Sequence, residues 1–223
     1  MASLKVIKLQ KLAYCQALEL QQQIFAKVKN NAFQNENHNP KAYLLFVEHE
    51  PVYTIGIRDK IYKDLQFQNT LKKTGAEFFA TNRGGLITFH GPGQLVVYPI
   101  LNLSDFPETK KSIKKFVCIL EGTVIELCKE LGVNNVTRMD SFPGVWIQND
   151  RKIAAVGIHC SRYVTMHGIS LNCNVDLKWY ENIIPCGIEN KTVTSLSKEL
   201  QINISPESVI DLFIKHFKKQ MNI

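Results

Sequence analysis

Two side chains in this 223-residue chain have the types and settings that nucleophilic chemistry requires, Cys186 and Lys152. Cys186 lies between a proline, which fixes φ, and a glycine, which lets other groups approach the backbone closely. A free thiol has a pKa near ~8.5, and a neighbouring ammonium lowers that pKa and increases the thiolate fraction. The sequence therefore predicts a nucleophile at Cys186, with Lys152 as the group that activates it.

Each of these residues also has an ordinary interpretation. A cysteine after a proline in an intracellular protein is more often a packed thiol, and a lysine after a turn is usually solvated. Cys186 and Lys152 are far apart in the sequence, so only the fold can bring them together. The functional interpretation therefore depends on the motifs around them.

Composition and charge limit the class of protein. With 45% hydrophobic residues the chain can bury a sizeable core, and we expect a single catalytic domain over residues 1–223. The formal charge of +7 favours acidic partners, or else a solvated basic surface. Scattered lysines without a recognisable binding module argue against nucleic acid. We find no membrane span or export signal, so we expect a cytoplasmic protein, with an organelle as the alternative.

The cysteines and histidines predict reduced thiols and no metal. Six cysteines without a Cys-x-x-Cys pair indicate free thiols, and Cys118 and Cys128 are expected to face the core from a helix. The residues that could suggest a metal site have spacings that fit no closed zinc pattern. These residues are His159, Cys160, His167 and Cys173.

Hydrophobic periodicity predicts helices and strands mixed along the whole chain. An amphipathic helix is expected to open the chain, and two more follow, so that the helices cover residues 14–28, 112–131 and 206–219. Strands are expected over residues 42–48, 52–56, 78–80, 86–90, 95–99, 144–147, 152–160 and 163–174. Residues 144–160 should form a hairpin with its turn at Asn149 and Asp150. This mixture predicts an α+β fold with a mixed sheet.

Several motifs in order resemble the lipoyl(octanoyl) transferase family. The first is Arg-Gly-Gly-Leu-Ile-Thr-Phe-His-Gly-Pro-Gly-Gln-Leu at residues 83–95. The others are Gly-Val-Trp at 144–146, Lys-Ile-Ala-Ala-Val-Gly at 152–157, His-Gly-Ile-Ser-Leu-Asn at 167–172, Ile-Pro-Cys-Gly at 184–187 and Val-Thr-Ser-Leu at 193–196. The resemblance covers the chain from Tyr14 to about Lys219.

The resemblance implies a fold related to the catalytic domains of biotin and lipoate protein ligases. It implies transfer of an octanoyl group from octanoyl-acyl carrier protein to a lysine of lipoyl domains, in 2-oxoacid dehydrogenase complexes and the glycine cleavage H protein. It further implies a Cys186 nucleophile aided by Lys152, with no cofactor, and an acyl pocket. The implied pocket residues are Arg83, Gly84, Gly85, Leu86, Ile87, Thr88, Phe89, His90, Ala155, Val156, Gly157, Gly168, Ile169 and Ser170.

The sequence leaves the roles of some pocket residues undecided. Small residues there would leave a slot for a straight alkyl chain. His90 could orient substrate or exchange a proton, or could serve only as a structural hydrogen-bonding group. Ser170 and Leu86 depart from the family pattern, which puts the acyl preference in doubt more than the activity.

Two other functions remain as alternatives. An ATP-dependent lipoate or biotin ligase would activate a free acid as an adenylate and need no cysteine. A catalytically inactive protein could bind acyl carrier protein or lipoyl domains through its basic surface. The presence of Cys186 in its motif and the lack of a ligase-like arginine-glycine nucleotide loop argue against the ligase. The presence of both Cys186 and Lys152 argues against the inactive binding protein.

Overall fold

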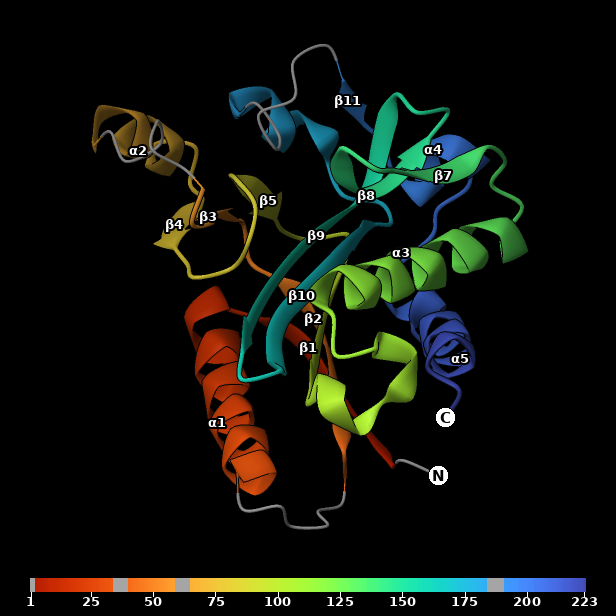
Figure 1. Ribbon diagram of the computed structural model, residues 1–223. Helices are drawn as coiled ribbons and strands as arrows, with labels where there is room; N and C mark the ends of the chain where they lie inside the picture. The colour runs from red at the N-terminus through yellow and green to blue at the C-terminus, as the bar shows by residue number, and fades with distance from the viewer. Residues whose placement is uncertain (1–2, 34–39, 59–64, 184–190) are drawn as a thin grey trace.

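The structure is a computed structural model that describes residues 3–33, 40–58, 65–183 and 191–223. Its centre is a mixed sheet in the order β1-β2-β6-β10-β9-β8-β7, with β11 beside β9, and a smaller sheet has the order β4-β3-β5 (Figure 1). Helices and a mixed sheet in one architecture confirm the predicted fold class. The strands of the large sheet are β1 (Leu4–Leu12), β2 (Ala42–His49), β6 (Gln94–Leu101), β7 (Val136–Met139), β8 (Phe142–Ile147), β9 (Arg151–Ser161), β10 (Val164–Asn172) and β11 (Thr192–Val193).

Helices cover both faces of the large sheet. In Figure 1, α1 lies along one side of the sheet, and α3 and α5 lie on the other. The small sheet sits at the end of the molecule that also carries α2. Its strands are β3 (Val52–Ile55), β4 (Glu77–Ala80) and β5 (Thr88–His90). The helices are α1 (Tyr14–Phe33), α2 (Leu65–Lys72), α3 (Ile113–Glu130), α4 (Leu196–Leu200) and α5 (Ile210–Met221), with 3₁₀ turns η2 (Leu103–Asp105), η3 (Pro107–Thr109), η4 (Leu177–Asn182) and η6 (Glu207–Val209).

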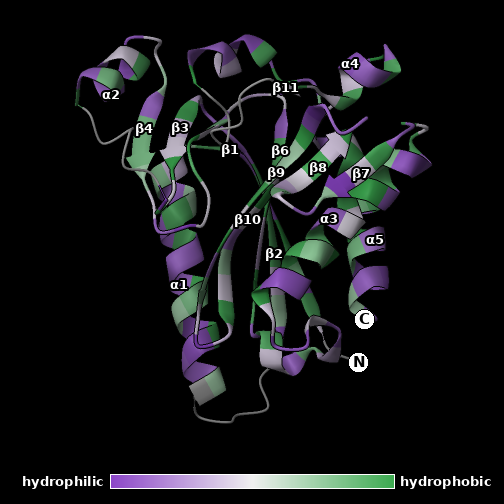
Figure 2. Ribbon diagram, turned by 45° about the horizontal axis from the view of Figure 1, so that its top comes forward, coloured by the Kyte–Doolittle hydropathy of each residue, from purple (hydrophilic) through white to green (hydrophobic). Residues whose placement is uncertain are grey.

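The apolar run of β2 is explained by this two-sided cover. Leu44 and Phe46 face the core under α3 and α5, whereas Leu45 and Val47 face the core under α1. Because successive side chains of a strand point to opposite faces, a strand buried on both sides is apolar at nearly every position. Figure 2 shows hydrophobic residues, in green, on strands in the middle of the sheet.

Local signals fixed the limits of α3 as predicted. Ser112 caps its first turn, where its hydroxyl accepts the backbone N–H of Lys115 at 3.3 Å. At the other end Gly132 has a φ of 88°, and its N–H donates to the Lys129 carbonyl at 3.0 Å. A glycine suits this left-handed position because it has no Cβ.

The predicted hairpin is also present, formed by β8 and β9. Gln148 and Asn149 have φ values of 54° and 57°, and the Asp150 N–H donates to the Ile147 carbonyl at 3.0 Å. Positive φ values at both central residues of this turn match the right-handed twist of the strands. The turn lies one residue earlier than the predicted one at Asn149 and Asp150. Lys152 therefore stands at the start of β9, as the sequence indicated.

Other expectations were wrong. The chain opens with β1 and not with a helix, and α2, β7 and α4 were not predicted. The regular part of the last helix begins at Ile210, after the 3₁₀ turn η6. Cys128 is buried, but Cys118 is only half-buried. The described cysteines, Cys15, Cys118, Cys128, Cys160 and Cys173, are all free thiols, as expected.

Within the described residues, no helix combines the length and the apolar character needed to cross a lipid bilayer.

The core under α5 supports a stability prediction. Phe213 is fully buried and lies edge-on to Phe46, with ring centroids 5.7 Å apart. Phe213→Ala should lower the free energy of unfolding by about 3–5 kcal/mol, because the cavity it leaves cannot fully collapse. Urea denaturation measures this. As a control, Ile202→Ala at an exposed position should change stability by less than about 0.5 kcal/mol, and an equal loss in both variants would contradict the prediction.

Candidate active site

A pocket lies where the loop between β4 and β5 passes over β9 and β10. The space not filled by atoms there is about 460 Å³, including the part open to solvent. Its walls come from segments far apart in the sequence. The lining residues are Tyr14, Arg83, Gly85, Leu86, Thr88, His90, Val96, Tyr98, Ala155, Val156, Gly157, His167, Gly168, Ile169 and Ser170.

Eleven of the fourteen residues expected in an acyl pocket line this one. The others are Gly84, Ile87 and Phe89, which do not line it. Ile87 and Phe89 are fully buried in the core of the small sheet, whereas Thr88 and His90 face the pocket. Strand alternation explains this, because neighbouring side chains in an extended segment point to opposite sides. The stretch from residue 86 to 90 therefore supplies alternate residues to the wall.

Close backbone contacts hold the loop against β9. The Gly84 N–H donates to the Ile158 carbonyl at 3.0 Å. A Cβ on Gly157 would lie 2.9 Å from the Gly84 carbonyl oxygen, so glycine is needed at this crossing. Arg83 is buried and donates from Nη2 to the Thr54 carbonyl at 2.6 Å and from Nη1 to the Gly84 carbonyl at 3.0 Å. These contacts tie the loop to both sheets.

Several pocket residues were missed by the sequence interpretation. Tyr14, Tyr98 and His167 line the wall, and His49 supports it from behind through a 2.7 Å contact between its Nε2 and the Tyr98 hydroxyl. Tyr98 shares a face of β6 with Val96, so strand periodicity could have indicated both once one was known. His167 belongs to the motif at 167–172, but its role there was left open.

The imidazoles around the pocket are neutral at physiological pH. Burial lowers the pKa of His49 to about 4 and the pKa values of His90 and His167 to about 3. His90 Nδ1 lies 2.7 Å from Gln94 Oε1. An amide oxygen can only accept, so Nδ1 carries the proton and donates it to Gln94. This contact supports the structural alternative for His90.

Lys152 lies next to this pocket. Its side chain is 5% exposed, its Nζ donates to the Pro143 carbonyl at 3.2 Å, and the same atom lies 4.7 Å above the Trp146 ring centroid. A small adjoining cavity is lined by Lys152, Ala154, Asn172, Tyr180 and Val193 together with Thr88 and Ala155 of the first pocket. Thr88 and Ala155 therefore form the boundary between the pocket and the Lys152 cavity.

Cys186 lies outside the described residues, so its contacts are not part of this description. The chain on either side of it returns to Lys152. Tyr180 and Val193 both line the Lys152 cavity, and Val193 pairs with Lys152 in the parallel ladder of β11 and β9. The two flanks of the predicted nucleophile thus meet at the predicted activating residue.

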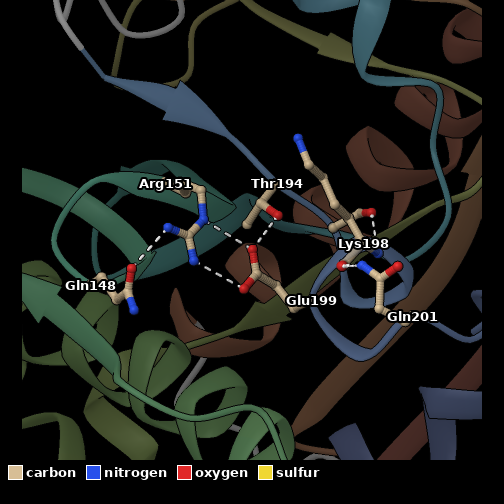
Figure 3. A network of polar contacts seen from close by, with 7 residues as sticks. Gln148, Arg151, Thr194, Lys198, Glu199 and Gln201 are labelled. Atoms are coloured by element: carbon tan, nitrogen blue, oxygen red, sulfur yellow. Dashed lines mark hydrogen bonds and ion pairs between the residues drawn. The ribbon is translucent and has the colours of Figure 1, made fainter.

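A polar network holds β11 in this position (Figure 3). Arg151 donates from Nε and Nη2 to the two carboxylate oxygens of Glu199, each at 3.0 Å. The hydroxyl of Thr194 donates to Glu199 Oε1 at 2.5 Å, and the Thr194 N–H donates to the Lys152 carbonyl at 2.9 Å. The network therefore joins the start of β9 to the residue after β11.

No group of three or more His, Cys, Asp or Glu side chains within the described part of the chain is arranged to hold a metal ion.

A family model described as the lipoyl protein ligase A/B catalytic domain matches residues 13–218. The chain belongs to this family. An enzyme of Danio rerio named mitochondrial octanoyl-acyl-carrier-protein:protein N-octanoyltransferase is 48% identical over 221 residues, covering 99% of this chain and 93% of the relative. An octanoyltransferase of Flavobacterium psychrophilum is 41% identical over 226 residues, covering 96% of this chain and 95% of the relative. This chain is therefore a transferase, and its reaction class is octanoyl transfer in protein lipoylation.

A solved structure confirms the fold relationship. The bipartite lipoate protein ligase of Thermoplasma acidophilum superposes with a TM-score of 0.73 at 15% identity, covering 100% of this chain and 85% of the other. At that identity the likeness shows the fold alone. It confirms that the transferase shares the fold of lipoate protein ligase catalytic domains.

The neutral histidines predict a pH dependence of stability. Their folded-state pKa values lie below the unfolded value of about 6.5, so the unfolded chain binds more protons as the pH falls below that value. Stability should therefore drop between pH 6.5 and 4, by up to about 1.4 kcal/mol per pH unit for each histidine. His49→Gln should remove one such contribution in urea denaturation at a series of pH values.

Tyr98→Phe is the matched control. It removes the same hydrogen bond to His49 without removing a group that titrates in this range, because burial raises the pKa of Tyr98 well above 10. Its destabilisation should therefore be nearly independent of pH. A pH slope in His49→Gln equal to that of the unmodified transferase would contradict the prediction.

The Arg151–Glu199 pair predicts a further loss of stability at acid pH. The hydrogen bonds from Arg151 lower the pKa of Glu199, so the pair stabilises the fold above the ordinary carboxyl pKa and this contribution is lost as the pH falls through the lowered value. Glu199→Ala should cost about 1–3 kcal/mol at pH 7, and less at acid pH. Glu126→Ala, at an exposed pair with Lys129, should cost less than about 0.5 kcal/mol. Equal losses at pH 7 would contradict a structural role for the network.

Proposed function

We propose that the transferase moves an octanoyl group from octanoyl-acyl carrier protein to a lysine of lipoyl domains through a thioester on Cys186. The observation that carries the proposal is the buried Lys152 amine at the boundary of a pocket whose wall includes small and apolar residues of β9 and β10. Residues 1–223 would act as one catalytic domain. The acyl chain would occupy the pocket, with its carbonyl end at Thr88 and Ala155.

The first half-reaction transfers the acyl group to the enzyme. The Cys186 thiolate, paired with the Lys152 ammonium, attacks the carbonyl carbon of the carrier thioester. The new carbon–sulfur bond forms, the bond to the carrier sulfur breaks, and the carrier thiolate takes a proton from Lys152. One thioester replaces another, so little free energy is lost.

The second half-reaction forms the amide. The neutral amine of the acceptor lysine attacks the acyl-enzyme, the bond to Cys186 breaks, and the proton of the attacking amine passes to Lys152. This restores the initial pair of thiolate and ammonium. Lys152 therefore serves as acid in the first half and as base in the second, and the cycle uses neither nucleotide nor metal.

The partners and location follow from the same proposal. The formal charge of +7 would attract acidic carrier and lipoyl domains to the enzyme. The acceptors would be lipoyl domains of 2-oxoacid dehydrogenase complexes and the glycine cleavage H protein. We propose the cytoplasm as the location, with an organelle as the alternative that the names of the Danio rerio and Drosophila melanogaster relatives favour, since both say mitochondrial.

Intact-mass measurement tests the acyl-enzyme. The purified protein, incubated with octanoyl-acyl carrier protein without ATP or acceptor, should gain one octanoyl group that hydroxylamine removes. Cys186→Ser should gain no octanoyl group, because it lacks the thiolate. Lys152→Ala should form the octanoyl adduct at least about 100-fold more slowly, because it lacks the group that acts as acid and base. Cys128→Ser, which removes a buried thiol, should behave as the unmodified protein.

The other outcomes identify the rival functions. No adduct on the unmodified protein, together with acylation of a lipoyl domain that needs ATP and Mg²⁺, would show a ligase. No adduct and no transfer under either condition would favour a binding protein without catalysis. An adduct that persists in Cys186→Ser would place the nucleophile elsewhere.

A further inference from the structure

A buried carboxylate that the proposed steps do not use lies beside the strand facing Lys152. Glu121, on α3, is 4% exposed, and its Oε1 accepts the Gly144 N–H at 2.7 Å. Burial raises the pKa of Glu121, and this effect is opposed by the Gly144 hydrogen bond and by the positive charges of Arg138 and Lys152. Burying a carboxylate costs free energy, so its position next to the site calls for a reason.

The N–H that Glu121 accepts belongs to the same peptide unit as the carbonyl that Lys152 contacts. That unit joins Pro143 to Gly144, and Lys152 Nζ donates to the Pro143 carbonyl at 3.2 Å. A peptide is planar and usually trans, so its N–H and C=O point in opposite directions from one rigid plane. Fixing the N–H on α3 therefore fixes the direction in which the carbonyl points.

The sheet leaves this peptide without regular support. The register of β8 against β9 shifts between Val145 and Trp146, next to this peptide. Gly144 has a φ of 126°, and a Cβ there would lie 2.5 Å from the Ala154 carbonyl oxygen, so the position requires glycine. Glycine alone would leave the peptide free to rotate. The carboxylate on α3 supplies the constraint.

We propose that Glu121 is a positioning residue for Lys152. Its carboxylate fixes the Pro143–Gly144 peptide, and the Pro143 carbonyl then holds the Lys152 amine at the boundary of the acyl pocket. The catalytic consequence rests on the proposed function, because it requires Lys152 to exchange protons with the reacting groups. The geometric consequence does not, because it concerns only how the amine is held.

Three substitutions separate the hydrogen bond from the charge. Glu121→Gln keeps an acceptor oxygen at the same reach, Glu121→Asp keeps the charge but withdraws the oxygen, and Glu121→Leu removes both. Glu126→Leu on the same helix is the matched control, because Glu126 is partly exposed and pairs only with Lys129 among the described residues. Circular dichroism and urea denaturation establish which variants fold.

The first readout needs no acyl substrate. Each protein is treated with acetic anhydride, and peptide mass spectrometry gives the acetylation rate of Lys152 relative to Lys215 in the same sample. In Glu121→Leu and Glu121→Asp, Lys152 should be acetylated several-fold faster, because the amine is no longer held. In Glu121→Gln and Glu126→Leu, the acetylation rate of Lys152 should match that of the unmodified protein. The second readout is octanoyl transfer. In Glu121→Leu and Glu121→Asp, kcat should fall about 10- to 100-fold, whereas KM for the acyl donor should change little.

The outcomes are distinct. Unchanged Lys152 acetylation in folded Glu121→Leu and Glu121→Asp would overturn the proposal. If Glu121→Leu does not fold, Glu121→Asp and Glu121→Gln decide between the two explanations. Faster Lys152 acetylation in Glu121→Gln, with an unchanged rate in Glu121→Asp, would show that the charge of Glu121 matters and not its hydrogen bond, and would overturn the proposal. Altered acetylation without any octanoyl transfer in the unmodified protein would support the positioning role and reject the proposed function.

Discussion

Burial of the Lys152 amine is the constraint on which the rest of the site depends. Removing an ammonium from water costs several kcal/mol unless protein groups replace its hydration. The Pro143 carbonyl and the Trp146 ring supply part of that replacement, and both belong to β8. The amine therefore stays in place only while β8 keeps its position beside β9 and beneath α3. In this way the packing of the helices bears directly on the chemistry.

Strand β9 joins the two parts of the site. Lys152 is its second residue, and it continues through Ala155 and Gly157, which line the pocket. The strand is paired with β8 on one side and with β10 and β11 on the other, so its backbone has little freedom. The register shift opposite β8 lies between these parts, and such bulges change the direction of side chains while the ladder continues on the other side. A cation and an apolar slot can thus lie close together on one rigid strand.

Much of the fold could be predicted because its signals are local. The cap at Ser112, the glycine after α3 and the turn at Asn149 each act within a few residues, and the structure has all three. The opening strand β1 was missed because its register shifts between Lys8 and Lys11, with a φ of 54° at Gln10, which breaks the alternation that marks a strand. The short α2 and α4 offered too few residues for periodicity to be recognised.

The site was predictable to the extent that it is encoded in continuous motifs. The stretch at 83–90, the residues at 155–157 and the residues at 168–170 meet in one pocket, although alternation removes Ile87 and Phe89 from its wall. Tyr14 and Tyr98 could not be found in this way, because only the tertiary arrangement brings α1 and β6 to the same wall. Glu121 lies within the helix predicted over residues 112–131, and nothing in its sequence neighbours reveals that it reaches a peptide on β8.

The polar residues at the pocket wall are compatible with an alkyl chain because they satisfy one another. His49 contacts the Leu12 carbonyl through Nδ1 at 3.0 Å and the Tyr98 hydroxyl through Nε2 at 2.7 Å, so both ring nitrogens have partners. A neutral ring whose nitrogens are already bonded presents mainly carbon to its surroundings, and an apolar chain beside it leaves no polar group unpaired. Ser170 also lines the wall, and its hydroxyl adds a polar atom that alanine lacks. Ser170 is therefore the wall position at which the departure from the family pattern bears on the acyl preference.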